Sequence, residues 1–345
     1  MTLNKSICLL LAAVSFITPA LAQSPADRIA AISKVSGVAG LSQNAWHLKA
    51  DATIFDNAGK NPQQGTIEAW HSGSDLRIVY TFGATTEIEI RNGSNTFRSS
   101  GPALPYRAEE IFETIYHPGP NAEEIQRSTV TVEKRSFDKI PMECFMLTQP
   151  VKGLGVSPLG LYPTYCAQAG SNVLRGNFDF GSGNIVFNGL GQFLGQNIPT
   201  NFSITEDDKV IATAKVTALG TYVPQPAQFV VTQDMKPLRF AVISGEVAAD
   251  NVFKKSTPKY PNKAPNSQKG GIVILKAVIG RDGHIHSLHV LQATNPEFAI
   301  SAITSVRGWT YKPYLLNGEA NEIATTIAIN FQHDFSGVEE GGVRH

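Results

Sequence analysis

Three histidines near the C-terminal end follow the spacing H-x-H-x-x-H: His284, His286 and His289. On a strand, His284 and His286 share one face and His289 lies on the other, because successive side chains alternate. Only two imidazoles can therefore act together, and we expect no carboxylate or cysteine to join them. Zinc sites in proteins use three or four protein ligands. The spacing favours solvated strand histidines over the alternative of a metal site, and we predict no metal and no cofactor.

Glu87 and Glu89 form a second candidate constellation, because two carboxylates on one strand face could divide acid and base roles. They alternate with Ile88 and Ile90, and this pattern favours a solvent-facing row of carboxylates over a catalytic pair. The chain also contains no Gly-x-Ser-x-Gly sequence of the type that presents a nucleophilic serine. We therefore predict no catalytic residues; an enzyme is the minor alternative.

The N-terminal segment has the pattern of an export signal. Lys5 precedes an apolar run from Ile7 to Ile17, Pro19 ends that run, and Ala20-Leu21-Ala22 is a small-x-small cleavage site. The run of about 11 residues is short against the roughly 20 that a membrane-spanning helix needs. We expect residues 1–22 to be removed and the mature protein to be periplasmic; an uncleaved anchor is the alternative.

Export to an oxidising compartment predicts the state of the cysteines that remain after the signal is removed. Cys144 and Cys166 are the pair outside residues 1–22, and an even count in an oxidising compartment predicts a disulfide. The chain-entropy model assigns such a closure roughly 3 kcal/mol of stabilisation. Two free thiols are the alternative.

The region from Thr257 to Phe331 has the most specific pattern. A β-branched strand ends in the turn Asp282-Gly283, a helix follows, and a last strand alternates apolar with polar residues. These features predict a small β-β-α-β unit. The positions that carry the motif of this unit are Tyr260, Pro261, Gly271, Asp282, Gly283, Trp309, Tyr311 and Pro313. The residues on one face of the last strand are Ile323, Thr325, Ile327, Ile329 and Phe331.

These residues, in this order, resemble the C-terminal domain of the TonB family over about residues 257–331. The resemblance implies that the exposed edge of the last strand, Ile323 to Phe331, accepts an extended peptide from an outer-membrane receptor by β-augmentation. The alternative is a core strand whose edge is capped by the preceding domain. The sequence departs from the family in having no mature membrane anchor and no long charged, proline-rich spacer, which a membrane-energised transducer needs.

The preceding part of the chain alternates with a period of two from Trp46 onward, with short helices expected between Pro105 and Gln126. This order, the helix before Trp46 and the strand entry Pro199-x-x-Phe202-x-Ile204 resemble the lipoprotein-carrier family (the LolA/LolB type). The resemblance implies an apolar concave surface for acyl chains. We expect an α+β, β-rich protein: a curved antiparallel half-barrel with a helical insertion, followed by the β-β-α-β domain.

The expected boundaries place the half-barrel in residues 23–222, a linker in 223–237, the TonB-like domain in 238–335 and a flexible tail in 336–345. Lys+Arg and Asp+Glu are equal at 29 each, which argues against a nucleic-acid partner. We expect an exported envelope protein that binds a protein partner by edge-strand pairing and could take part in transport. The alternative is a periplasmic carrier of a lipid or acylated ligand in the half-barrel.

Overall fold

The computed structural model describes residues 23–105, 107–148, 161–261 and 270–332. The predicted signal segment, 1–22, and the predicted tail, 336–345, lie outside the described residues. Within the described ranges, no helix combines the length and the apolar composition needed to cross a bilayer.

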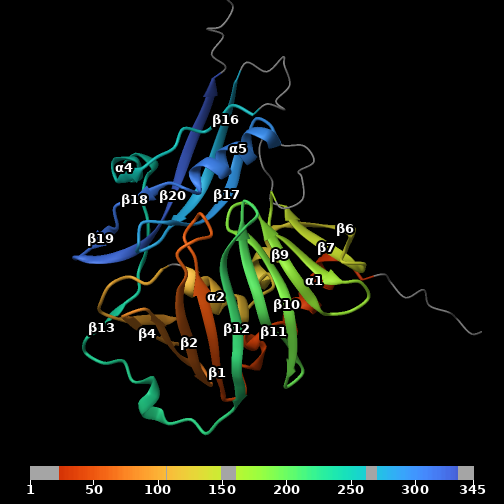
Figure 1. The fold of residues 1–345 in the computed structure, drawn as a ribbon, viewed down its shortest axis with the longest axis vertical. Coiled ribbons are helices and arrows are strands. Elements are labelled where there is room, and N and C mark those ends of the chain that lie inside the picture. Colours follow the sequence, from red (N-terminus) through yellow and green to blue (C-terminus); the bar gives the residue numbers. More distant parts are fainter. Residues whose placement is uncertain (1–22, 106, 149–160, 262–269, 333–345) are drawn as a thin grey trace, which may run out of the picture.

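Thirteen antiparallel strands form one curved sheet in the N-terminal part of the molecule (Figure 1). Strands next to each other in sequence are mostly neighbours in space, joined by tight turns such as those at Gly73, Gly83 and Gly93, which have positive φ. The strand order is β13-β5-β4-β3-β2-β1-β12-β11-β10-β9-β8-β7-β6. The strands are β1 (Trp46–Ile54), β2 (Gln63–Ser72), β3 (Asp75–Phe82), β4 (Thr85–Asn92), β5 (Asn95–Ser99), β6 (Thr129–Phe137), β7 (Ile140–Thr148), β8 (Thr164–Gln168), β9 (Leu174–Asp179), β10 (Gly183–Phe193), β11 (Gln196–Glu206), β12 (Lys209–Thr221) and β13 (Met235–Pro237).

Helices fill the concave side of this sheet. The helices are α1 (Pro25–Lys34), the 3-10 turn η1 (Val38–Leu41), α2 (Arg107–Tyr116) and α3 (Ala122–Arg127). Helix α1 begins where the Ser24 side chain accepts a hydrogen bond from the Asp27 amide, and Asn121 caps α3 in the same way. Phe112 of α2 is fully buried in the same core as Trp46 and Tyr80 from the sheet. The predicted curved half-barrel with a helical insertion is confirmed.

Cys144 and Cys166 form the predicted disulfide, which joins directly opposed positions of β7 and β8. Both cysteines lie in a small cluster with Met142, separate from the main core. The disulfide therefore links two strands on the side of the sheet that faces away from the helices.

The segment expected as a linker, residues 223–237, is partly structured. It contains a 3-10 turn, η2 (Pro226–Phe229), and strand β13, which pairs with β5 at the border of the large sheet. Phe229 and Met235 are buried, which explains the attachment, because both apolar side chains lose their contact with water when the segment lies against the sheet. The part of the segment from Met235 onward is a sheet strand.

The C-terminal domain lies at one end of the half-barrel (Figure 1). Its main sheet has the order β14-β20-β16-β17, with β19 also paired to β20, and helix α5 packs on β16 and β17. The predicted β-β-α-β unit is β16, β17, α5 and β20, to which short elements are added. The elements are β14 (Phe240–Val242), α4 (Gly245–Asp250), β15 (Val252–Lys254), β16 (Gly270–Ile279), β17 (Ile285–Ala293), α5 (Pro296–Val306), β18 (Thr310–Tyr311), β19 (Tyr314–Leu316) and β20 (Glu319–Gln332).

Candidate partner-binding site

Strand β20 has two different sides. On one side it pairs with β16 from Ile323 to Gln332. Strand β19 continues this side by pairing with residues 319–321, beyond the end of β16. On the other side β14 runs parallel to residues 322–324. Among the described residues, no strand pairs with this second side beyond Ala324. The edge that the TonB resemblance implied to be exposed is therefore covered by β14 at residues 322–324 and contacted by Gly245 of α4 at the Thr326 carbonyl, where a Cβ would lie 2.6 Å from the oxygen; it is open from Ile327 onward.

The main-chain groups on the open side belong to the even-numbered residues. The Ile243 amide donates a hydrogen bond of 3.0 Å to the Ala324 carbonyl, so the Ala324 main chain points away from β16. Residues two apart in a strand point the same way, which directs the main-chain groups of Thr326, Ala328 and Asn330 outward as well. Their side chains are exposed. Because Gly245 of α4 lies against the Thr326 carbonyl, the donors and acceptors of the open edge are those of Ala328 and Asn330.

The five residues predicted from the sequence to form the partner-binding face pack inside the domain. Their side chains are all buried, at 8% exposure or less, because they face α5 and the domain core. Their main-chain groups point toward β16, since they alternate with those that point outward. The residues in question are Ile323, Thr325, Ile327, Ile329 and Phe331. The alternation located the strand and its buried face, but the groups available to a partner belong to the intervening residues.

A groove of about 650 Å³ runs beside the open edge. One wall is β20 from Thr326 to Ala328, and the other is helix α4 with Lys255. Trp309 and Tyr311 line it; the Trp309 indole is held by a 2.9 Å hydrogen bond to the Ser256 carbonyl and lies 4.8 Å below the Lys255 ammonium. The groove thus has main-chain groups on one side and both a carboxylate, Glu246, and a cation, Lys255, on the other, above the largely buried rings of Trp309 and Tyr311.

Large apolar side chains lie exposed on the segment that borders this edge. Phe240 and Val242 of β14 are 57% and 79% exposed, and Phe253 of β15 is 76% exposed. Three such side chains within one short segment leave more apolar surface in water than scattered single residues do, and such surface marks interaction sites. The open edge therefore lies beside both a groove and an uncovered apolar segment.

The motif positions of the C-terminal domain build its scaffold. Gly271 lies so close to Phe298 that a Cβ there would be 2.4 Å from the ring, and the Tyr260 ring meets Phe298 edge to face at 5.3 Å. Gly283 has a φ of 80°, which glycine adopts without strain. Trp309 and Tyr311 are buried. Pro261 lies in the irregular segment that follows β15, and Pro313 lies between β18 and β19.

The histidine cluster differs from the prediction. His284 and His286 lie 3.2 and 3.6 Å from the Asp282 carboxylate, and His286 also lies 3.5 Å from Glu322. The expectation that no carboxylate joins them is wrong, because the Gly280–Gly283 turn brings Asp282 back over β17 while β20 supplies Glu322. Burial opposes the charged imidazole, but both carboxylates outweigh burial and raise the pKa of His286 to about 9. His289 is exposed, and within the described ranges no set of three or more His, Cys, Asp or Glu side chains is arranged to hold a metal.

Glu87 and Glu89 are not on a solvent-facing row, so that prediction is wrong. The two residues are 2% and 0% exposed, because helix α2 and the C-terminal domain cover this part of the concave face. Arg98 of β5 lies 2.6 Å from Glu89, and Arg281 of the C-terminal domain lies 2.7 Å from Glu87. Burial raises the pKa of Glu87, and the Arg281 and Arg98 charges oppose that rise. The two carboxylates are parts of a buried ion-pair network.

A second set of contacts fastens the C-terminal domain to the half-barrel. Arg307, at the end of α5, donates to the Phe180 carbonyl at 3.0 Å and pairs with Asp207 at 2.6 Å. The β9–β10 turn also rests on β17, since a Cβ on Gly181 would lie 2.1 Å from the Leu288 carbonyl oxygen. The half-barrel thus covers part of β17 and leaves the far side of β20 open.

Comparison with protein-family models gives one match: residues 256–333 match the family described as Gram-negative bacterial TonB protein C-terminal. A search of curated proteins found no match. Residues 256–333 are therefore a TonB-type C-terminal domain, confirming the resemblance of that region.

Solved structures give weaker similarities. A DUF1329 family protein from Desulfovibrio piger is 13% identical, with 60% of this chain and 95% of that chain covered and a TM-score of 0.39. A LolA superfamily protein from Nitrosomonas europaea is 9% identical, with 59% and 96% covered and a TM-score of 0.40. The MucA/MucB complex from Pseudomonas aeruginosa is 8% identical, with 75% and 81% covered and a TM-score of 0.29. The strand order described above makes the N-terminal part a curved antiparallel half-barrel, and the match of residues 256–333 makes the C-terminal part a TonB-type domain.

Proposed function

We propose that this protein works in the bacterial cell envelope and binds an extended segment of a protein partner along the open edge of β20. The observation that supports the proposal is the outward main-chain edge at Ala328 and Asn330, next to the groove with Trp309. A periplasmic location agrees with the export signal expected in residues 1–22 and with the TonB-type domain. A segment of an outer-membrane receptor is the partner that the family resemblance favours.

Main-chain pairing alone gives modest affinity. Each hydrogen bond contributes about 0.5–1.5 kcal/mol net, and the open edge offers few of them. Apolar contact must supply the remainder, since about 25 cal/mol is gained per Å² of apolar surface removed from water. Phe240, Val242 and Phe253 offer such surface beside the edge. We therefore expect a partner segment that is extended and bears apolar side chains at alternate positions.

The experiment replaces Ala328 by proline. A proline there removes an outward N–H and places its ring on the open side, while the pairing of Ile327 and Ile329 with β16 is retained. Ala328→Val is the matched control, because it keeps the N–H and suits a strand. Proline at Ile327, whose amide faces β16, would instead disturb the core ladder.

The probe is a library of nine-residue extended peptides, and affinity is measured by fluorescence polarisation. The best binder should lose at least tenfold in affinity for Ala328→Pro and little for Ala328→Val. N-methylation of that peptide at alternate residues should weaken binding at one set of positions only, because a paired strand uses every second amide. Equal binding by both variants, or equal tolerance of N-methylation at all positions, would contradict edge pairing.

The alternative of a lipid carrier has less support. Tyr80, Phe112 and Phe202 are fully buried on the concave side of the half-barrel, where the carrier hypothesis places an acyl chain. Helix α2 packs into this side and supplies Phe112. Edge pairing by the C-terminal domain is therefore the function that we propose.

A further inference from the structure

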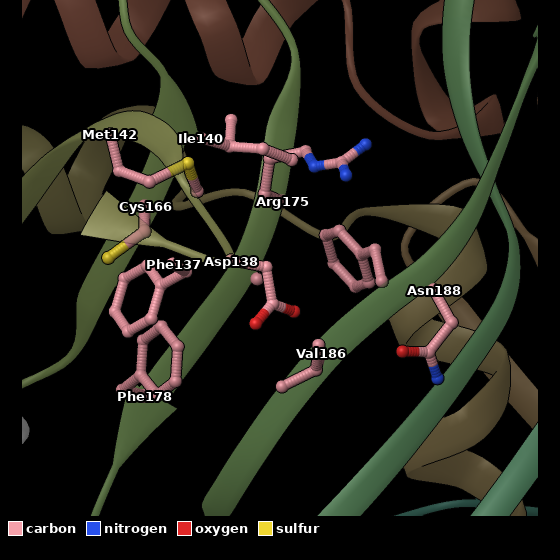
Figure 2. A pocket seen from close by; sticks show the side chains of 11 residues that line it. Phe137, Asp138, Ile140, Met142, Cys166, Arg175, Phe178, Val186 and Asn188 are labelled. Carbon is pink, nitrogen blue, oxygen red and sulfur yellow. The ribbon is translucent and has the colours of Figure 1, made fainter. Parts of the chain in front are cut away.

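An apolar pocket of about 370 Å³ lies on the outer side of the large sheet, in the region of the disulfide (Figure 2). Its apolar lining includes Phe137 and Phe178, whose rings stack at 5.7 Å, together with Met142 and Cys166. Phe137 and Val186 in this lining are each 40% exposed. The chain therefore leaves apolar surface uncovered in a pocket whose volume lies at the lower end of the range for small ligands, about 300–1,000 Å³.

Two β-bulges place polar side chains at this pocket. Between β8 and β9 the register passes from Cys166 opposite Gly176 to Ala167 opposite Leu174, which leaves Arg175 as an extra residue. Between β10 and β11 it passes from Phe187 opposite Phe202 to Gly189 opposite Asn201, which leaves Asn188 as an extra residue. Bulges change the direction of a side chain and occur next to functional sites. Both extra residues line the same pocket.

Arg175 and Asn188 lie across the pocket from the stacked rings (Figure 2). In the described part of the chain, neither side chain has a hydrogen bond or an ion pair. An arginine guanidinium offers donors in a fixed fork that fits a carboxylate, and an amide N–H can add a further donor. A guanidinium without a partner beside apolar surface is therefore suited to a ligand with the opposite charge.

Asp138 also lines the pocket and has the opposite effect on such a ligand. It lies in the turn between β6 and β7, is exposed, and has a φ of 49°. Solvent screens an exposed carboxylate more than a half-buried guanidinium, so Arg175 should dominate the preference for charge. Asparagine is tolerated at positive φ, so this carboxylate can be neutralised without strain.

We propose that this pocket binds a small amphiphile with a carboxylate group. The carboxylate pairs with Arg175 and Asn188, and the apolar body lies against Phe137, Phe178 and Met142. The site is separate from the β20 edge, so it adds a ligand function to the half-barrel and does not depend on peptide binding.

The test titrates decanoate, below its micellar concentration, into the full-length protein and measures heat of binding. Decyltrimethylammonium is the probe of equal chain length and opposite charge. We expect one decanoate per chain, at least tenfold weaker binding by Arg175→Gln, and about threefold tighter binding by Asp138→Asn. Val186→Asn should also weaken binding, because it makes the lining polar. Lys49→Gln, on β1 of the same sheet and outside the pocket lining, is the matched control and should bind as the native chain does.

Arg175→Gln and Asp138→Asn should keep the native thermal transition, because neither Arg175 nor Asp138 has a side-chain partner within the part of the chain that the structure describes. Decanoate binding that is unchanged by Arg175→Gln would overturn the proposal. Equal or tighter binding of decyltrimethylammonium would also overturn it, because the carboxylate of Asp138 would then set the preference. Absence of decanoate binding up to the micellar limit has the same consequence.

Discussion

The guanidinium of Arg281 lies 2.7 Å from the carboxylate of Glu87, and this ion pair joins the two domains. Arg281 belongs to the turn between β16 and β17 in the TonB-type domain, whereas Glu87 is on β4 of the half-barrel. Both side chains are largely buried, at 14% and 3% exposure. Glu87 also lies 3.4 Å from Arg98 of the half-barrel. The buried Glu87 carboxylate is therefore paired with one arginine from each domain.

Removal of Arg281 should therefore destabilise the whole molecule. Loss of one partner of a buried ion pair typically costs about 3–5 kcal/mol, because the remaining charge stays buried without compensation. Since Arg98 still compensates Glu87, we expect Arg281→Ala to lower the free energy of unfolding by about 2–3 kcal/mol. Urea denaturation followed by tryptophan fluorescence measures this change.

The double variant Glu87→Gln/Arg281→Ala separates the ion pair from lost packing. The loss of unfolding free energy in the double variant should be smaller than the sum of the two single losses by at least about 1 kcal/mol. The reason is that the double variant removes both charges, whereas each single variant leaves one partner behind. Arg135→Ala, which removes an arginine of an exposed pair, is the control and should change stability by less than about 0.5 kcal/mol. Simple additivity would mean that Arg281 and Glu87 do not interact energetically.

His286 should make stability depend on pH. Its pKa in the folded protein is about 9, against an ordinary value of 6.5, so folding favours the charged imidazole. The stabilisation is complete below pH 6.5 and is lost as the pH rises through 9. The carboxylates that face it are Asp282 and Glu322, with Glu109 and Glu110 of helix α2 near enough to interact by charge. We expect an effect of about 1–3 kcal/mol.

The measurement compares the native chain with His286→Gln in urea at pH 6 and at pH 9.5. The difference in unfolding free energy between the two proteins should be largest at pH 6 and small at pH 9.5. A difference that stays constant across this range would show that His286 does not gain its proton on folding.

The sequence predicted those features that depend on local pattern or on one pair of residues. Alternation predicted β20, the helix expected after the Asp282-Gly283 turn and its following strand is α5, and the even number of cysteines predicted the Cys144–Cys166 disulfide. Alternation separates the two faces of a strand but does not tell which of them is covered. For Glu87 and Glu89, the arginines that make burial possible come from β5 and from a turn almost 200 residues later in the chain.

The same limit applies to the β20 edge and to the outer pocket. Family resemblance indicated β20 as the partner-binding strand, which stays a prediction, and the partial cover by β14 depends on a three-residue parallel pairing that has no signal in sequence. The bulges at Arg175 and Asn188 are register shifts between strand pairs, and periodicity within one strand does not show them. Such features follow from the way distant segments meet.

The export signal predicts a definite start of the mature protein. Cleavage after Ala22 would leave Gln23 as the first residue. N-terminal sequencing and intact mass of the protein purified from the periplasm of a Gram-negative host measure this directly. A retained Met1 would contradict cleavage and would make membrane-anchored energy transduction the better hypothesis.

The partner at the β20 edge can be identified in the envelope with a photo-reactive residue at Asn330. The Asn330 side chain is exposed and its main chain points to the open side, so a bound strand would lie within reach of the probe. We expect cross-links to an outer-membrane receptor, lost when Ala328→Pro is combined with the probe and kept with Ala328→Val. The same probe at Asp208, exposed in the turn between β11 and β12, is the positional control.

Two outcomes would contradict strand pairing: the same cross-linked products from Asp208, or Asn330 products that Ala328→Pro leaves unchanged. Either would mean that the cross-links come from general proximity in the envelope. Because Ala328→Pro and Ala328→Val differ in whether position 328 keeps its N–H, the contrast between them tests for the main-chain bond on which the proposed function depends.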